Sequence, residues 1–330
     1  MLMLACWGAG QLFSDRWEWS QWLLWIPTVA VLVLLLCTIV LLAIQKRKMY
    51  TIVLSLVFDV LLVQFVFVEH QMFANSKCVG QISIAGWTMS HSKKVVSKES
   101  GKIIVAMDAD ITLLTHGWYV RGEESVQNWM QSQGRILING PFTLCTKFQP
   151  ITVRSLVAAD GIYISEFVLD TTAVLGKPLT VWAVDLPSKL SLPRRALSRE
   201  VVSRMKFAEK NSPDIVLGDF NMTRNSSAIR TMFPALHDAA DEGGIGLLAT
   251  FPMHFPLYHI DHILLSETLQ ACSYECINPH IGRHRMQFAT IAKTPLRRNN
   301  KIKVVTGLRI RRKSGHQDPA SHQYSTVVKR

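Results

Sequence analysis

Two long apolar runs stand near the start of the chain and predict a pair of membrane-spanning helices. Residues 22–44 form a 23-residue stretch without a charged side chain, and residues 49–68 form a 20-residue stretch interrupted only by Asp59 and Gln64. A helix rises about 1.5 Å per residue, so each run is long enough to cross the roughly 30 Å hydrocarbon core of a bilayer. We therefore expect residues 1–69 to be a membrane anchor with spans at about 22–44 and 49–68.

The loop between the two runs predicts which way the chain crosses the membrane. It carries three consecutive cations, Lys46, Arg47 and Lys48, and short loops rich in Lys and Arg stay on the cytoplasmic side. The sequence thus predicts a multi-pass protein of the inner (cell) membrane whose C-terminal part is periplasmic or extracytoplasmic. The apolar residues 1–13 are too short to span, which leaves open an interfacial segment or the end of a first span that begins upstream of Met1.

Short strand-like runs and a few helical patterns follow in residues 70–295, which we expect to be one folded domain. The expected strands are short, rich in β-branched residues and bounded by turn residues: 81–85, 102–106, 111–114, 135–138, 163–169, 179–184, 214–217, 260–265 and 286–291. Helical patterns are expected at 125–131 and 193–208. Strands outnumber helices, so the pattern favours an α/β or α+β sandwich over an alternating parallel barrel.

Composition and charge set the two ends of the chain apart from this domain. At 48% hydrophobic and 18% charged residues, the chain is neither disordered nor collagen-like nor a disulfide-stapled miniprotein. Most of the formal net charge of +12 lies in residues 296–330. This basic tail is expected to be disordered. It is either an arm for phosphate-rich partners, nucleic acid or anionic lipid headgroups, or a solvated end.

Six cysteines bear on the compartment of the domain. Four of them lie after residue 69, at Cys78, Cys145, Cys272 and Cys276. The predicted topology exposes these four to an oxidising compartment, where a disulfide is permitted. Their pairing is left open, and Cys272 and Cys276 lack the second pair of ligands that a zinc finger needs.

Three separate motifs carry the candidate chemistry. Residues 216–221, Val-Leu-Gly-Asp-Phe-Asn, end an apolar strand with Asp219 and Asn221, which alternation along a strand places on the same side. Asp261 follows in the expected strand 260–265, and His284 precedes the last strand. A carboxylate next to an imidazole raises the pKa of the ring and fixes its tautomer, and an imidazolium stabilises charge on a reacting phosphate.

The order of these motifs resembles the endonuclease/exonuclease/phosphatase superfamily over most of residues 80–293. With the apolar start, the chain looks most like the bacterial membrane-anchored members of the teicoplanin-resistance type. The resemblance implies a four-layer sandwich of two stacked mixed sheets flanked by helices, and hydrolysis of phosphate esters with Mg²⁺ or Mn²⁺. It also implies a role for each matching residue: Asp219 activates water, Asn221 holds a phosphate oxygen, His284 stabilises the charge that develops, and Asp261 orients His284.

Four positions depart from the pattern of this family. Thr88 stands where the family has the Asn of the first strand, and His116 where it has the metal-binding Glu. Asp185 replaces a His before Leu-Pro, and Arg283 replaces the Asp before the last His. Mg²⁺ prefers hard oxygen ligands, so these changes alter the metal site most.

Three interpretations of the altered site stay open. Asp185 and His116 rebuild a site that favours Mn²⁺ or Zn²⁺, or Arg283, with Thr88, holds the substrate phosphate in place of a metal, or the site has decayed on a retained fold. The first two describe a membrane-anchored, outward-facing phosphohydrolase whose tether favours lipid-linked substrates, such as phospholipid or polyprenyl phosphates, over duplex DNA. The third describes a pseudoenzyme that binds anionic ligands or nucleic acid. The oligomeric state is not predicted.

Overall fold

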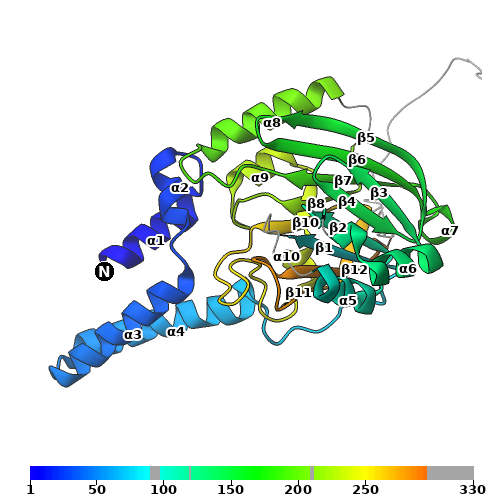
Figure 1. The fold of residues 1–330 in the computed structure, drawn as a ribbon. Coiled ribbons are helices and arrows are strands. Elements are labelled where there is room, and N and C mark those ends of the chain that lie inside the picture. The colour runs from blue at the N-terminus through cyan, green and yellow to red at the C-terminus, as the bar shows by residue number, and fades with distance from the viewer. Residues whose placement is uncertain (90–96, 119, 209–211, 296–330) are drawn as a thin grey trace, which may run out of the picture. The chain divides into compact units, whose positions relative to one another are not determined.

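Two six-stranded sheets pack face to face in the domain that follows the N-terminal helices (Figure 1). The computed structural model describes residues 1–89, 97–118, 120–208 and 212–295, so the basic tail expected at 296–330 lies outside the described residues. The first sheet has the order β11-β12-β1-β2-β4-β3, and the second has the order β5-β6-β7-β8-β10-β9. Both sheets are mixed, with one parallel pair each, β1 with β2 and β7 with β8.

The strands of the first sheet are β1 (Ile82–Thr88), β2 (Ile111–Thr115), β3 (Arg135–Asn139), β4 (Phe142–Thr146), β11 (Leu269–Ile277) and β12 (Met286–Lys293). Those of the second are β5 (Gln149–Ala159), β6 (Ile162–Asp170), β7 (Leu179–Asp185), β8 (Ile215–Asp219), β9 (Leu236–Asp238) and β10 (Asp261–Ser266). Their inward side chains form a shared apolar core between the sheets, with Ile84, Leu113, Val181, Leu217 and Ile263 almost fully buried. The sandwich expected from the sequence is therefore confirmed.

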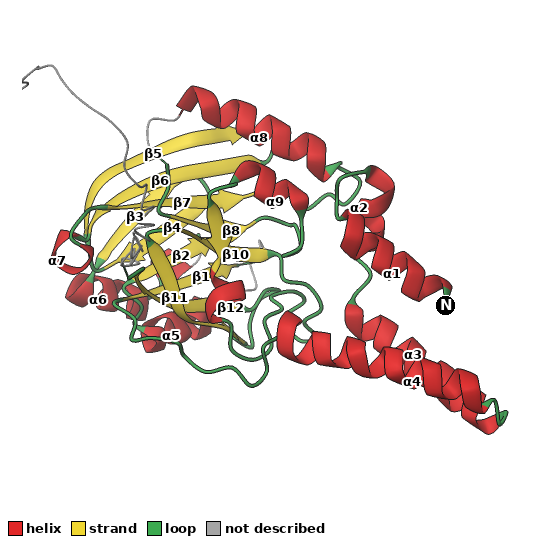
Figure 2. Ribbon diagram, turned by 180° about the vertical axis from the view of Figure 1, so that it is seen from behind, coloured by secondary structure: helices red, strands yellow, loops and turns green. Residues whose placement is uncertain are grey.

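Helices cover the outer faces and complete four layers (Figure 2). The helices on the first sheet are α5 (Ser97–Met107) and α6 (Glu124–Gln133), and those on the second are α8 (Arg194–Ala208) and α9 (Ser227–Met232). The remaining short helical elements of the domain are η2 (Val120–Gly122), α7 (Thr172–Leu175) and α10 (Ala239–Gly243).

One expected strand was wrong. Residues 102–106 lie inside helix α5, between the parallel strands β1 and β2. Parallel neighbours need a long crossover, usually a helix, because a tight turn cannot reverse the chain twice. The buried Ile104 of α5 lies three to four residues after the buried Ser100 and Gly101, along one face of the helix. A strand would bury every second residue.

Four α-helices and a π-helical turn precede the domain: α1 (Leu2–Phe13), α2 (Glu18–Leu24), α3 (Thr28–Ile44), α4 (Lys48–Val63) and η1 (Gln64–Glu69). Among the described residues, only the continuous helix Lys48–Glu69 is by itself long and apolar enough to cross a membrane. Helices α3 and α4 lie side by side (Figure 1). Large apolar side chains on both helices are exposed. Such a surface is rare on a soluble monomer.

The expected span 22–44 is not one straight helix. α2 ends at Leu24, α3 begins at Thr28, and their axes differ by 68°. Pro27 stands at the break, where its ring restricts the preceding residue and removes a helical hydrogen-bond donor. α3 alone, with 17 residues, is about 25 Å long, shorter than the bilayer core.

Buried polar side chains fasten the N-terminal helices to the domain. The Asp15 carboxylate, between α1 and α2, accepts hydrogen bonds from the Ser227 amide (2.7 Å) and the Ser227 hydroxyl (2.5 Å) at the start of α9. A carboxylate at a helix N-terminus satisfies amides that have no helical partner. Gln21 of α2 donates to the carbonyl of Leu190 (2.7 Å) and accepts from the amide of Arg194 (2.7 Å).

A disulfide fixes the segment that leads from the N-terminal helices into the first sheet. Cys78, in the segment after Glu69, is bonded to Cys272 of β11, whereas Cys145 and Cys276 are free thiols. The bond closes a loop across 194 residues of sequence.

We expect Cys272→Ala to destabilise the protein by about 3 kcal/mol, because the bond restricts the unfolded chain. Differential scanning fluorimetry in detergent should give a melting temperature lower by roughly 5–10 °C. Reductant should lower the melting temperature of the wild type to that of this variant and leave Cys78→Ala/Cys272→Ala unchanged. Alkylation of both cysteines in the folded, unreduced wild type would contradict the pairing.

Candidate active site

Three neighbouring strands bring three carboxylates to one edge of the second sheet. Asp185 at the end of β7 pairs in register with Asp219 at the end of β8, which pairs with Asp261 at the start of β10. Directly paired residues point to the same face of a sheet. Gly218 lets the backbone of β8 lie close to that of β7. Its φ is 140°, and a Cβ there would lie 2.0 Å from the Val184 carbonyl oxygen.

Asp261 connects the two sheets beneath the site. Its Oδ2 lies 2.8 Å from Nδ1 of His284, just before β12, and its Oδ1 accepts a hydrogen bond of 2.5 Å from the hydroxyl of Thr88 at the end of β1. Burial opposes the charge on Asp261, but the His284 charge and these hydrogen bonds outweigh burial and lower its pKa. Asp261 is therefore an anion at neutral pH.

His284 carries the matching positive charge. Burial disfavours the charged ring, but the carboxylates of Asp261 and Asp219 outweigh burial and raise the pKa of His284 to about 9. Trp87 fixes the backbone next to the ring, because its indole N–H donates to the His284 carbonyl oxygen at 3.2 Å. The imidazolium uses Nδ1 for Asp261, so its Nε2–H is the donor available to a ligand.

The pKa of Asp219 is raised, whereas that of Asp261 is lowered. Burial first, and then the negative charges of Asp261 and Asp185, raise the pKa of Asp219 well above its usual range, and the charge of His284 offsets only part of this rise. One carboxylate oxygen accepts the amide hydrogen of Asn221 at 2.9 Å. A carboxyl group with a raised pKa suits a general base, which must hold and release a proton near neutral pH.

Asn221 follows Asp219 in a left-handed conformation, with φ of 50°. Its side-chain Nδ2 donates to the Leu186 carbonyl oxygen at 2.9 Å. An amide NH₂ has two donors, so the second N–H can serve an anionic ligand.

The four altered positions lie around the same site. His116, just after β2, has its Nε2 3.0 Å from Oδ2 of Asp185, so the two residues expected as an altered metal site do meet. The hydroxyl of Thr88 donates a hydrogen bond to Asp261. Arg283 is exposed, with its guanidinium 5.7 Å from the ring centroid of Phe251.

These residues surround a cleft of about 1030 Å³. Seven of the eight residues singled out from the sequence line it, and Asp261 lies beneath them. Aromatic side chains that the sequence did not single out form much of the remaining wall: Trp25, Trp118, Tyr163, Phe251 and Tyr258. Trp25 comes from the break between α2 and α3 and packs edge-on against Tyr258, with 4.9 Å between the ring centroids. No local sequence signal marks Trp25, because it lies within an apolar run.

The donor set fits a divalent cation. Ligand atoms of Asp219, Asp261 and His284 all lie within 4.8 Å of one another. Asp261 already uses both oxygens for Thr88 and His284, however, so the Asp219 carboxylate is the donor left for a cation. Asp185 pairs in register with Asp219 and contacts His116, so a second carboxylate and an imidazole flank this donor, a mixture that suits Mn²⁺ or Zn²⁺ better than Mg²⁺.

Comparison with known proteins identifies the fold. The model of the endonuclease/exonuclease/phosphatase family matches residues 104–291. No curated protein sequence matches the chain.

Several solved structures are similar to this chain at low sequence identity. A functionally unknown conserved protein from Enterococcus faecalis is 15% identical, with a TM-score of 0.50 over 64% of this chain and 100% of that chain. A mannosyl-6-phosphatase from Bacteroides thetaiotaomicron is 13% identical, with a TM-score of 0.50 over 64% and 99%. An endonuclease/exonuclease/phosphatase from Bacteroides vulgatus is 14% identical, with a TM-score of 0.49 over 64% and 99%.

We expect Asp261→Asn to lower the pKa of His284 well below about 9, because burial remains when the carboxylate that favours the charged ring most is removed. Titration of ¹³C-labelled histidines by NMR in the purified full chain measures this pKa. Asp170→Asn, which removes an exposed carboxylate at the end of β6, should leave it unchanged. If the pKa of His284 stayed near 9 in Asp261→Asn, Asp261 would not be the residue that keeps His284 protonated.

Proposed function

Because this chain belongs to the endonuclease/exonuclease/phosphatase family, we propose that it hydrolyses phosphate esters through Asp219, Asn221, Asp261 and His284. One observation carries the proposal: Asp219 and His284 line the same cleft. They offer a base and an imidazolium from two different sheets. Asp261 keeps the imidazolium charged and fixed in place.

The proposed reaction is attack of water on the phosphorus atom. Asp219 accepts a proton from the water as its oxygen bonds to phosphorus, the P–O bond to the leaving group breaks, and solvent protonates the leaving oxygen. The Nε2–H of His284 and the free N–H of Asn221 donate to the phosphate oxygens, where negative charge grows in the transition state. Because the protein already holds these donors in place, the site needs little reorganisation to reach the transition state.

A divalent cation would supply further neutralisation of the phosphate oxygens. Asp219, Asp185 and His116 are the residues that would hold it. The register of the strands supports this, because it places the carboxylates of Asp185, Asp219 and Asp261 side by side, where a cation would offset their repulsion.

We expect the purified full chain with Mn²⁺ to hydrolyse bis-p-nitrophenyl phosphate or a pyrophosphate, and chelation to stop turnover. Asp219→Asn and His284→Gln should each lower kcat by about a thousandfold or more, and the exposed controls Asp170→Asn and His254→Gln should not. Wild-type rates in either site variant would contradict the assignment. No turnover by the wild type, with phosphate binding retained, would identify a pseudoenzyme instead.

We further propose that the domain is membrane-anchored and faces an extracytoplasmic compartment. The exposed apolar surface of α3 and α4 supports the anchor, with Lys48–Glu69 as one span and the bent pair α2–α3 as the other. The Cys78–Cys272 disulfide supports the orientation, because disulfides persist in oxidising compartments. The cationic loop Lys46–Lys48 supports the same orientation independently.

The substrate is proposed to be a lipid-linked phosphate ester. Trp25, at the break in the bent pair, lines the cleft together with the apolar side chains of Met89, Trp118 and Leu190. A headgroup phosphate would then reach Asp219 while the apolar part of the molecule stays near the anchor. This arrangement disfavours duplex DNA, whose backbone offers no apolar group for that wall.

We expect Trp25→Ala to lower the rate on a phospholipid in vesicles by about tenfold, through lost apolar contact, and to leave the rate on bis-p-nitrophenyl phosphate within about twofold. Trp22→Ala, exposed on α2 three residues earlier, is the matched control. Equal losses on the two substrates would argue against a membrane-side wall, and faster cleavage of an oligonucleotide than of lipid would favour nucleic acid.

A further inference from the structure

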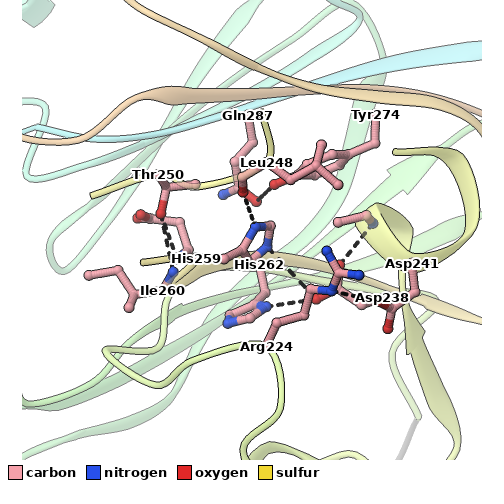
Figure 3. Close-up of polar contacts among 12 residues, drawn as sticks. Arg224, Asp238, Asp241, Leu248, Thr250, His259, Ile260, His262, Tyr274 and Gln287 are labelled. Carbon is pink, nitrogen blue, oxygen red and sulfur yellow. Dashed lines mark hydrogen bonds and ion pairs between the residues drawn. The ribbon is translucent and has the colours of Figure 1, made fainter. Parts of the chain in front are cut away.

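A second buried polar cluster lies on the far side of β10 from the catalytic carboxylate. His262 follows Asp261 in this strand, and alternation turns its side chain away from the cleft. It meets Asp238 at the end of β9 and His259 just before β10 (Figure 3). These three side chains are each at least nine-tenths buried, and one ligand atom from each lies within 4.8 Å of the others.

Backbone carbonyls fix which nitrogen of each ring carries hydrogen. A carbonyl oxygen only accepts, so Nε2 of His262 donates to Met222 at 2.9 Å, and Nδ1 of His259 donates to Leu248. The opposite nitrogens face Asp238: Nδ1 of His262 is 2.7 Å from its Oδ2, and Nε2 of His259 is 3.9 Å from the same oxygen. If both rings are neutral, two nitrogen lone pairs and a carboxylate point at one another, so a positive charge must lie among them.

A single proton satisfies only part of this cluster. On Nδ1 of His262 it would complete the short contact to Asp238 but leave Nε2 of His259, which has no hydrogen-bond partner among the described residues, buried and unsatisfied. One cation with several coordination positions would satisfy all three side chains.

We propose that Asp238, His259 and His262 form a structural Zn²⁺ site, separate from the catalytic centre. Two imidazoles and a carboxylate are a common zinc donor set, and each imidazole donates its other N–H to a backbone carbonyl, as zinc-bound histidines do. Donors of tetrahedral zinc stand about 3.3 Å apart, and the contacts of 2.7 Å and 3.9 Å lie on either side of this value. Small side-chain rotations would therefore admit the ion.

We expect a fourth ligand to come from the side of the N-terminal helices. His259 also lines a small cavity of about 130 Å³ between the N-terminal helices and the domain, together with His70 and Arg224. Water in this cavity can complete the coordination. Arg224 does not compete with the ion for Asp238, because its Nε is 2.6 Å from Asp241 (Figure 3).

The ion would hold the catalytic strand in place. It would link β9, β10 and residues 248–259, which also carry Thr250. The hydroxyl of Thr250 accepts from the amides of Ile260 (3.2 Å) and Asp261 (3.3 Å), so the same segment positions the carboxylate that orients His284.

The test uses the full chain in detergent, stripped with chelator and given Zn²⁺ alone, with bound zinc measured by mass spectrometry. Asp219→Asn serves as the background that weakens the catalytic cation site. We expect His259→Gln to remove one zinc per chain from this background, and the neighbouring His237→Gln to remove none. Equal zinc content in the two double variants would overturn the proposal.

A second measurement covers the case in which His259→Gln does not fold. Saturating Zn²⁺ should raise the melting temperature of the Asp219→Asn protein by about 3 °C, and Co²⁺ in its place should give the intense visible absorption of a four-coordinate site. No change in melting temperature, or a weak octahedral cobalt spectrum, would overturn the proposal.

Discussion

The contact between Asp261 and His284 is the interaction on which the rest of the site depends. A buried carboxylate without partners costs several kcal/mol, and Asp261 avoids this cost by bonding to His284 and Thr88, both on the first sheet, and to Thr250 beside its own strand. These bonds join the two sheets at the edge where the cleft opens. The sandwich therefore fixes both the position and the charge of the imidazole.

At the same edge of the sheet, His284 pairs with Asp261 and not with Asp219. Asp219 lies between two other carboxylates and next to one imidazolium, and its pKa is raised as a result. A site with this imbalance is stabilised by a bound cation or by a proton on Asp219. β10 thus contributes to two polar clusters, with Asp261 in the candidate active site and His262 in the buried cluster behind it.

The pattern of strand-like runs predicted the sandwich. The resemblance to the family singled out the residues that the structure brings together at the cleft, and alternation along a strand accounted only for Asp219 and Asn221. The sequence did not predict the helix at 102–106, since a short β-branched run has no period of its own and the crossover between β1 and β2 decides its form. Trp25, the Cys78–Cys272 pair and the link from Asp238 to His262 depend on contacts between residues far apart in the chain. Local pattern carries no information about such contacts.

The most direct measurement of the central claim is an experimental structure of the full chain with Mn²⁺ and orthovanadate, a mimic of the phosphate during attack. We predict one vanadate in the cleft, with its oxygens within hydrogen-bonding distance of Nε2 of His284 and Nδ2 of Asn221, and with an apical oxygen against the Asp219 carboxylate. Vanadate bound away from Asp219, or Asp219 and His284 facing different cavities, would contradict the account.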